Sequence, residues 1–76
     1  MSSVKDLRKA QGMSQQDLAD KMGVSREFIS MIENGNVRPS FDNIPKMAEL
    51  LKISSGELIF LLSGVKSSYE DTKQSA

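Results

Sequence analysis

The sequence of 76 residues contains no cysteine and no histidine. Without cysteine the chain forms neither disulfides nor thiolate metal sites, which fits a reducing compartment. Without histidine it lacks the commonest nitrogen ligand of metals and the commonest general base in catalysis. The sequence therefore argues against an enzyme and predicts no metal and no cofactor, because its Ser, Asp and Lys side chains are explained as helix caps and solvated surface.

Long apolar runs are also absent. The longest one, Leu58 to Leu62, is far shorter than the roughly 20 residues that span a bilayer. The first residues lack the basic and then apolar layout of a signal peptide. We therefore expect a soluble, cytoplasmic protein that makes no contact with membranes.

The chain has no excess of either charge, because its ten basic and ten acidic residues cancel. Proteins that bind nucleic acids are usually basic overall, so the bulk charge does not point to DNA. The positions of the cations matter more, because electrostatic attraction comes from the few that reach phosphates.

The pattern of apolar residues indicates an all-α protein. Strand-like alternation is missing, whereas apolar residues recur at helical spacing from Val4 to Leu62. The sequence predicts one compact five-helix bundle over residues 1–64. Residues 65–76 are rich in Ser, Lys, Asp and Glu and have no apolar period, so they are expected to form a flexible polar tail.

Each expected helix follows a serine that can cap it, and most precede a glycine that can end it. The expected helices span about residues 4–11, 15–22, 26–34, 41–51 and 55–63, after Ser3, Ser14, Ser25, Ser40 and Ser54. The glycines expected to end four of them are Gly12, Gly23, Gly35 and Gly64. Pro45 leaves a later start of the fourth helix, near Asn43 or Ile44, as the alternative.

The apolar spacing within each helix indicates which side chains face the core. The residues expected to face inward are Val4, Leu7, Ala10, Leu18, Ala19, Met22, Ile29, Ile32, Phe41, Ile44, Ala48 and Leu51. Ile29 and Ile32 define the buried side of the third helix. The residues that then point away from the core are Glu27, Ser30, Met31 and Asn34.

Only Gly23, Val24 and Ser25 separate the second and third expected helices. So short a connection makes the two helices cross steeply, which is the geometry of a helix-turn-helix. Arg26 then lies in the first turn of the third helix, where such proteins place side chains that read bases in the major groove. We expect Arg26 to make a bidentate contact with guanine, a contact that discriminates by about 1 to 3 kcal/mol.

The other residues of the third helix are weaker candidates for DNA contacts. Glu27 can accept from a cytosine amino group, Ser30 can pair with several base edges, and Met31 can pack on a thymine methyl group. The alternative for each is an ordinary solvated helix surface. Phe28 fits the edge of the core better than it fits a DNA contact.

Phosphate contacts are expected on both sides of this base-reading helix. Gln15 opens the second helix, where free backbone amides and the positive end of the helix dipole attract phosphate. Asn34 and Arg38 lie just beyond the third helix and are expected to hold the DNA backbone on the far side. Such contacts fix the position of a protein on the duplex without reading its sequence.

The segment from Ser14 to Gly35 reads SQQDLADKMGVSREFISMIENG and resembles the helix-turn-helix of Cro and the phage repressors, the XRE type. The resemblance extends from Val4 to about Leu62 and includes LRKAQGMSQ and IPKMAELL near the first and fourth helices. It implies the fold of the lambda-repressor DNA-binding domain. It also implies a bacterial or phage transcription regulator whose partner is double-stranded DNA.

Position by position, the resemblance assigns roles to residues of this chain. It implies that Gln15 binds phosphate and steadies the recognition helix, and that Arg8 and Glu33 form an internal ion pair. It implies DNA contacts from Ser25, Arg26, Glu27, Ser30, Met31, Asn34 and Arg38. Phe28 joins them because the chain is also similar to the controller proteins of restriction-modification systems, in which an aromatic here can approach DNA. The commonest phage repressors have glutamine at the position of Arg26, so a different operator is expected.

The fifth expected helix is apolar nearly all round. It contains Leu58, Ile59, Phe60, Leu61 and Leu62, whereas a helix on the outside of so small a domain buries only about half its circumference. These five residues are predicted to form a homodimer interface, which places two recognition helices about 34 Å apart on a pseudo-palindromic operator. The alternatives are a helix central to a monomer, or an antitoxin-like module that uses this helix or the tail to bind another protein.

Overall fold

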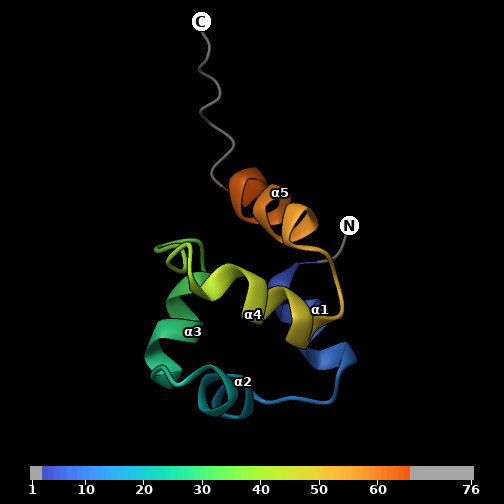
Figure 1. The fold of residues 1–76 in the computed structure, drawn as a ribbon. Coiled ribbons are helices and arrows are strands. Elements are labelled where there is room, and N and C mark those ends of the chain that lie inside the picture. The colour runs from blue at the N-terminus through green and yellow to red at the C-terminus, as the bar shows by residue number, and fades with distance from the viewer. Residues whose placement is uncertain (1–2, 66–76) are drawn as a thin grey trace, which may run out of the picture.

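The computed structural model describes residues 3–65 and contains five helices in this part of the chain (Figure 1). They are α1 (Val4–Ala10), α2 (Gln15–Met22), α3 (Arg26–Glu33), α4 (Asn43–Leu51) and α5 (Ser55–Val65). Residues 3–65 include no strand, so the predicted all-α class and the five predicted helices are confirmed. The predicted tail lies outside the described residues, apart from Val65, which belongs to α5.

Three of the helices begin with a capping box at a serine, as the sequence predicts. Each of these serines accepts the backbone N–H of the residue three positions on, at 3.0 to 3.1 Å. The acidic side chain at that position accepts the N–H of the serine in return, at 2.9 to 3.2 Å. The closed capping boxes are Ser3 with Asp6, Ser14 with Asp17, and Ser54 with Glu57. Such local bonds set where α1, α2 and α5 begin.

Helix α4 begins at Asn43, which is the later of the two predicted starts. Pro45 therefore lies in the first helical turn, where its missing N–H has no partner to lose. The expectation that Ser40 caps this helix is wrong, because the N-cap is Asp42 and it makes no side-chain capping bond. Phe41 precedes the helix and is 82% exposed, so the expectation that it faces the core is also wrong.

Three helix ends differ from the predicted ones. Helix α1 ends at Ala10, which is exposed instead of inward-facing, and α3 ends at Glu33 with Asn34 as its C-cap. Helix α5 continues through Gly64 to Val65, so Gly64 does not end it. Glycine permits the left-handed conformation that ends a helix but does not impose it. At Gly23 and Gly35 the chain does adopt it, with φ of 72° and 80°.

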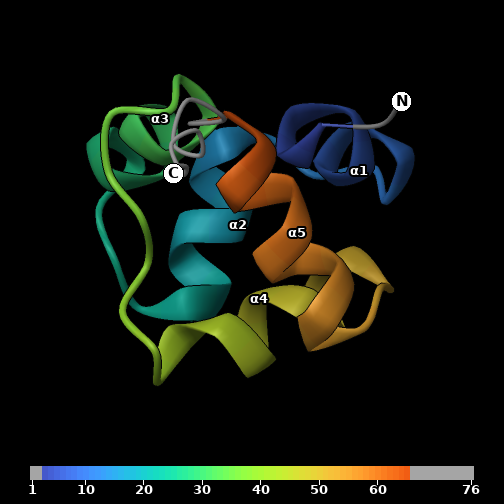
Figure 2. The same ribbon diagram turned by 90° about the horizontal axis from the view of Figure 1, so that it is seen from above.

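One apolar core holds the helices together. Helix α2 packs against α3, α4 packs against α5, and both α1 and α2 contact α4. Seen from above, α1 and α3 lie on either side of α2, and α5 lies in front of α2 (Figure 2). Leu7 and Ile44 are partly buried against this core. The core residues are Val4, Met13, Leu18, Ala19, Met22, Ile29, Ile32, Met47, Ala48, Leu51, Leu58 and Leu62.

Candidate nucleic-acid interface

A three-residue turn joins α2 to α3. Gly23 takes a left-handed conformation that only glycine adopts readily, and the N–H of Val24 donates back to the carbonyl of Ala19 at 3.0 Å. Ser25 then caps α3, because its hydroxyl accepts the N–H of Phe28 at 3.1 Å. The predicted helix-turn-helix connection is confirmed.

The polar side of α3 points away from the core. Ile29 and Ile32 are fully buried, as predicted, and they attach the helix to the rest of the domain. Arg26 and Glu27 are exposed, and Phe28 is half-buried against the core. The other predicted contact residues of this helix and its cap are exposed or half-buried: Ser25, Ser30, Met31 and Asn34. The structure thus brings the predicted base-reading side chains to one accessible surface.

Beneath this surface, Arg8 of α1 and Glu33 of α3 form the ion pair that the resemblance implies. Arg8 donates to Glu33 through Nε at 2.6 Å and through Nη2 at 3.3 Å, and its Nη1 donates to the carbonyl of Met13 at 2.7 Å. The two side chains are only 6% and 4% exposed. Because both charges are paired and hydrogen-bonded, their burial carries no uncompensated charge.

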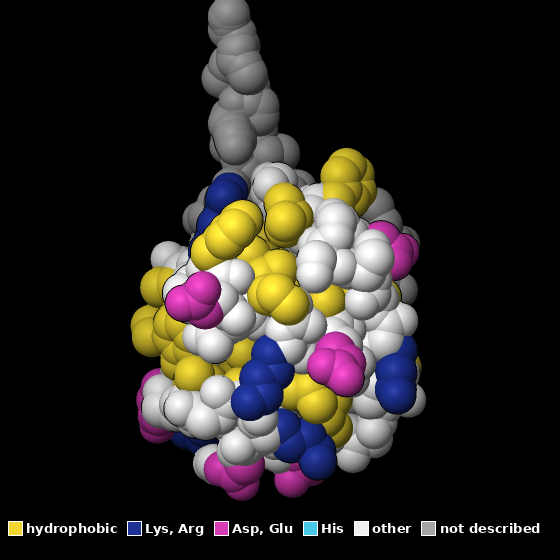
Figure 3. Space-filling view, viewed as in Figure 1, with side chains coloured by type: hydrophobic (Ala, Val, Ile, Leu, Met, Phe, Trp, Pro, Cys, Tyr) yellow, Lys and Arg dark blue, Asp and Glu magenta, His cyan; other side chains and the backbone are white. Residues whose placement is uncertain are grey.

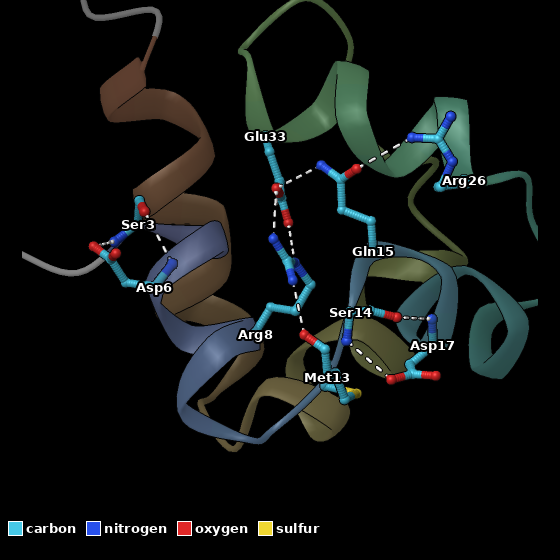
Figure 4. A network of polar contacts seen from close by, with 9 residues as sticks. All are labelled: Ser3, Asp6, Arg8, Met13, Ser14, Gln15, Asp17, Arg26 and Glu33. Carbon is cyan, nitrogen blue, oxygen red and sulfur yellow. Dashed lines mark hydrogen bonds and ion pairs between the residues drawn. The ribbon is translucent and has the colours of Figure 1, made fainter.

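Gln15 connects this buried pair to the exposed surface (Figure 4). Its Nε2 donates to Glu33 Oε1 at 3.0 Å, and its Oε1 accepts from Arg26 Nη1 at 3.4 Å. Arg26 Nη2 also lies 3.5 Å from Glu27 Oε2. Sequence reasoning did not identify the contact between Gln15 and Glu33, because it joins residues 18 positions apart on two different helices. A contact of this kind depends on the angle at which the helices cross.

The loop after α3 carries the remaining predicted phosphate contact. Gly35 adopts the expected left-handed conformation, and the N–H of Asn36 donates to the carbonyl of Met31 at 2.9 Å. Arg38 is exposed in this loop, and the neighbouring Pro39 is buried. The loop therefore holds its backbone against the domain while the guanidinium of Arg38 stays accessible.

Acidic caps change the electrostatics at the start of α2. The backbone N–H of Ser14, and then its hydroxyl, hold the pKa of the Asp17 carboxyl below its usual value. Ser3 lowers the pKa of Asp6 at the start of α1 in the same order of causes. A negative carboxylate beside the first turn of α2 offsets the positive end of the helix dipole.

Helix α5 presents a second, apolar surface. Leu58 and Leu62 are 0% and 6% exposed, so the expectation that all five apolar residues face a partner is corrected: these two close the core of the monomer. Ile59 and Phe60 are 41% and 67% exposed, and Leu61 is half-buried. In Figure 3, hydrophobic side chains are frequent on the upper part of the molecule, where α5 lies in Figure 1, and charged ones are mainly lower.

Within residues 3–65, no three Asp, Glu, Cys or His side chains gather so that they could hold a metal ion. No helix in the same part of the chain is long and apolar enough to cross a membrane.

Known proteins resemble this chain over most of its length. A relative from Mycobacterium tuberculosis, described as an HTH-type transcriptional regulator, is 30% identical over 64 residues, which are 84% of this chain and 45% of the relative. The ImmF control region 10 kDa protein of Bacillus phage phi105 is 36% identical over 50 residues, 66% of this chain and 56% of its own length. The chain thus spans about half the length of these relatives.

A relative of more similar size comes from Methanothermobacter thermautotrophicus. This HTH-type transcriptional regulator is 34% identical over 59 residues, which are 78% of this chain and 86% of the relative. No solved structure matches the chain at a significant level. The model of the helix-turn-helix family matches residues 4–58, which contain the turn, the buried ion pair and the capping boxes of Ser14 and Ser54. The chain belongs to the helix-turn-helix family.

Proposed function

We propose that this protein is a sequence-specific DNA-binding transcription regulator, and that it represses by occupying a pseudo-palindromic operator as a homodimer. The observation that carries the proposal is the exposed polar side of α3, which a glycine turn and Gln15 hold in place beside α2. In helix-turn-helix proteins such a surface enters the major groove. Because operators and their promoters lie on the chromosome or phage genome, the proposal places the protein in the cytoplasm.

Each predicted contact has a distinct part in this proposal. Arg26 reads a guanine. Further contacts in the groove come from Ser25, Glu27, Phe28, Ser30 and Met31. Gln15, Asn34 and Arg38 hold the DNA backbone on the two sides of α3. Because the net charge is zero, cations are not in excess over anions, and the affinity for unrelated DNA is expected to be low. Binding then depends on these few contacts and on dimerisation.

Selection from random DNA at two salt concentrations tests the proposal. We expect an inverted repeat whose half-site contains a G·C pair, and we expect Arg26→Ala to lose the preference at that pair. Lys46→Ala is the control, because Lys46 is an exposed cation on α4. It is expected to leave the selected motif unchanged. If no motif emerges, and added salt weakens binding to all sequences equally, the proposal is wrong.

The dimer is proposed to form through Ile59 and Phe60, with Leu61 beside them. Ile59 and Phe60 are exposed apolar residues on one helix, and burying them against a second copy would stabilise a dimer. Phe60→Lys is expected to make the protein monomeric in sedimentation at micromolar concentration. Phe41→Lys is the matched control, because Phe41 is even more exposed but lies outside α5. A wild-type protein that stays a monomer with and without DNA would contradict the dimer.

The same exposed residues favour a second candidate, a protein-interaction module such as an antitoxin. In that case Ile59 and Phe60 contact a different protein, and DNA binding is weak and blind to sequence. The candidate predicts a tight complex with that protein which Phe60→Lys abolishes and Phe41→Lys preserves. The selection experiment distinguishes the two functions, because only the regulator yields a motif.

A further inference from the structure

The side-chain amide of Gln15 lies between two groups that cannot exchange roles. The Glu33 carboxylate only accepts hydrogen bonds, and the Arg26 guanidinium only donates them. The Gln15 nitrogen must therefore face Glu33, and its oxygen must face Arg26, which is the arrangement with bonds of 3.0 and 3.4 Å. The reversed amide would bring its N–H groups against the guanidinium and its oxygen against the carboxylate.

The carboxylate that orients Gln15 is itself fixed. Glu33 receives two hydrogen bonds from Arg8, and Arg8 is also bonded to the carbonyl of Met13. Both charged side chains are nearly fully buried. Buried groups with all their bonds made have little freedom to change conformation. The orientation set at Glu33 is therefore transmitted to Gln15 and, through its oxygen, to Arg26.

Arg26 keeps enough free donors to read a base while Gln15 holds it. A guanidinium has five N–H groups. Gln15 uses one on Nη1, and Glu27 approaches Nη2 at 3.5 Å. Three N–H groups remain, and a bidentate contact with guanine needs two. The contact with Gln15 is thus compatible with base reading and restricts only the direction in which the guanidinium points.

We propose that Glu33 is a positioning residue for base recognition, which acts through the Gln15 amide to hold Arg26 in the orientation that reads guanine. The inference rests on the proposed function. Ordering an unrestrained, rotamer-rich side chain reduces affinity by about 2- to 13-fold. This cost arises only on the site where Arg26 meets its guanine, and not on a site that lacks it. Loss of the restraint therefore lowers discrimination, whereas loss of a phosphate contact lowers affinity for both sites equally.

Gln15→Met tests the transmitting residue, because methionine has a similar length and makes neither hydrogen bond. The measurement is the ratio of affinities for the selected operator and for an operator in which A·T replaces the G·C pair. We expect this ratio to fall by about 2- to 13-fold. Gln16→Met is the matched control, because Gln16 is the next residue of α2 and its side-chain amide donates to Asp20 of the same helix. Its ratio is expected to equal that of the wild type.

The double variant Arg8→Met, Glu33→Met tests the origin of the restraint. Apolar residues of similar volume often replace a buried ion pair without loss of stability, so a thermal melt is expected to show a folded protein. Gln15 is still present in this variant and can still reach phosphate. We expect the discrimination ratio to fall as it does in Gln15→Met. If the double variant does not fold, a second test combines Gln15→Met with Arg26→Ala. If Gln15 acts through Arg26, the discrimination ratio of this combined variant must be no lower than that of Arg26→Ala alone.

The outcomes separate this inference from the proposed function. If the wild type selects no motif, the proposed function fails, and the positioning role fails with it. If the wild type selects a motif that Arg26→Ala loses, but Gln15→Met lowers affinity for both operators equally, the proposed function stands and the positioning role is overturned. An unchanged ratio in a folded Arg8→Met, Glu33→Met protein would also overturn it.

Discussion

Helices α2 and α3 expose polar side chains, whereas α5 exposes apolar ones. On α3, the apolar residues Ile29 and Ile32 are buried, and the exposed Arg26 is bonded to Gln15. On α5, apolar side chains occur on both the buried and the exposed sides, with Leu58 in the core and Phe60 outside. Hydrogen bonds order the first surface for a polar partner, and apolar area makes the second suitable for another protein surface. The predictions below test this difference.

The largest expected effect concerns the buried pair under the polar surface. Glu33→Ala leaves the Arg8 guanidinium buried without its partner, which destabilises the fold by about 3 to 5 kcal/mol. Urea unfolding measures the loss. The double variant Arg8→Met, Glu33→Met is the control, because it removes both charges and is expected to cost much less. Equal losses in the two proteins would show that the pair contributes through packing and not through charge.

The two sides of α5 are expected to respond differently to alanine. Leu58→Ala opens a cavity in the core and costs about 2 to 5 kcal/mol at any protein concentration. Phe60→Ala is expected to change the stability of the monomer by less than about 0.5 kcal/mol. Its loss relative to the wild type is expected to grow with protein concentration, because association would stabilise the proposed wild-type dimer. Unfolding at several concentrations measures both. A Phe60→Ala loss that does not depend on concentration would contradict an interface role for this residue.

Replacement by alanine is expected to have opposite effects on stability at two glycines, one in the turn between α2 and α3 and one near the start of α5. A Cβ at Gly23 meets nothing within 4 Å, but the residue has φ of 72°, so Gly23→Ala is expected to cost about 1 to 2 kcal/mol. At Gly56 the nearest atom lies at 3.9 Å, no positive φ occurs, and the residue is helical. Gly56→Ala is therefore expected to stabilise the fold by up to about 1 kcal/mol. Thermal melts of both variants show whether the signs are opposite.

The smallest expected effect is a dependence of stability on pH at the start of α2. The pKa of Asp17 is lower in the folded protein than its ordinary value of 3.8, so its stabilising contribution is fully present above that value. As the pH falls below about 4, the unfolded chain binds a proton first, and the contribution is lost. Melting temperatures between pH 6 and pH 3 are expected to fall less steeply for Asp17→Asn than for the wild type. Parallel curves would contradict a role for this carboxylate.

Local interactions explain which parts of the fold could be predicted from the sequence. The capping boxes join residues three positions apart, so a pair such as Ser14 and Asp17 is visible in the sequence. Phe41 was predicted on the wrong side because its exposure depends on where α4 begins, and Pro45 moves that start to Asn43. The end of α5 was wrong because Gly64 has no side chain that prevents a helix from continuing.

In the candidate site, too, features set within one helix were predicted and contacts between helices were not. Helical periodicity was sufficient to place Glu27 outside and Ile29 inside. Periodicity within one helix says nothing about contacts between helices, so the bond from Gln15 to Glu33 was missed. The burial of Leu58 was missed for a related reason. A helix that is apolar all round does not reveal which side its neighbours cover, and α4 determines this.

The ion pair between Arg8 and Glu33 also limits how far the helix-turn-helix can be treated as a separable unit. Arg8 lies 25 positions before its partner and belongs to α1, outside the two helices that would be moved in a graft. A transplanted α2 and α3 would bring Glu33 into a new scaffold without the cation that pairs with it. An engineered protein that borrows this recognition helix must also supply an arginine at the same place in space.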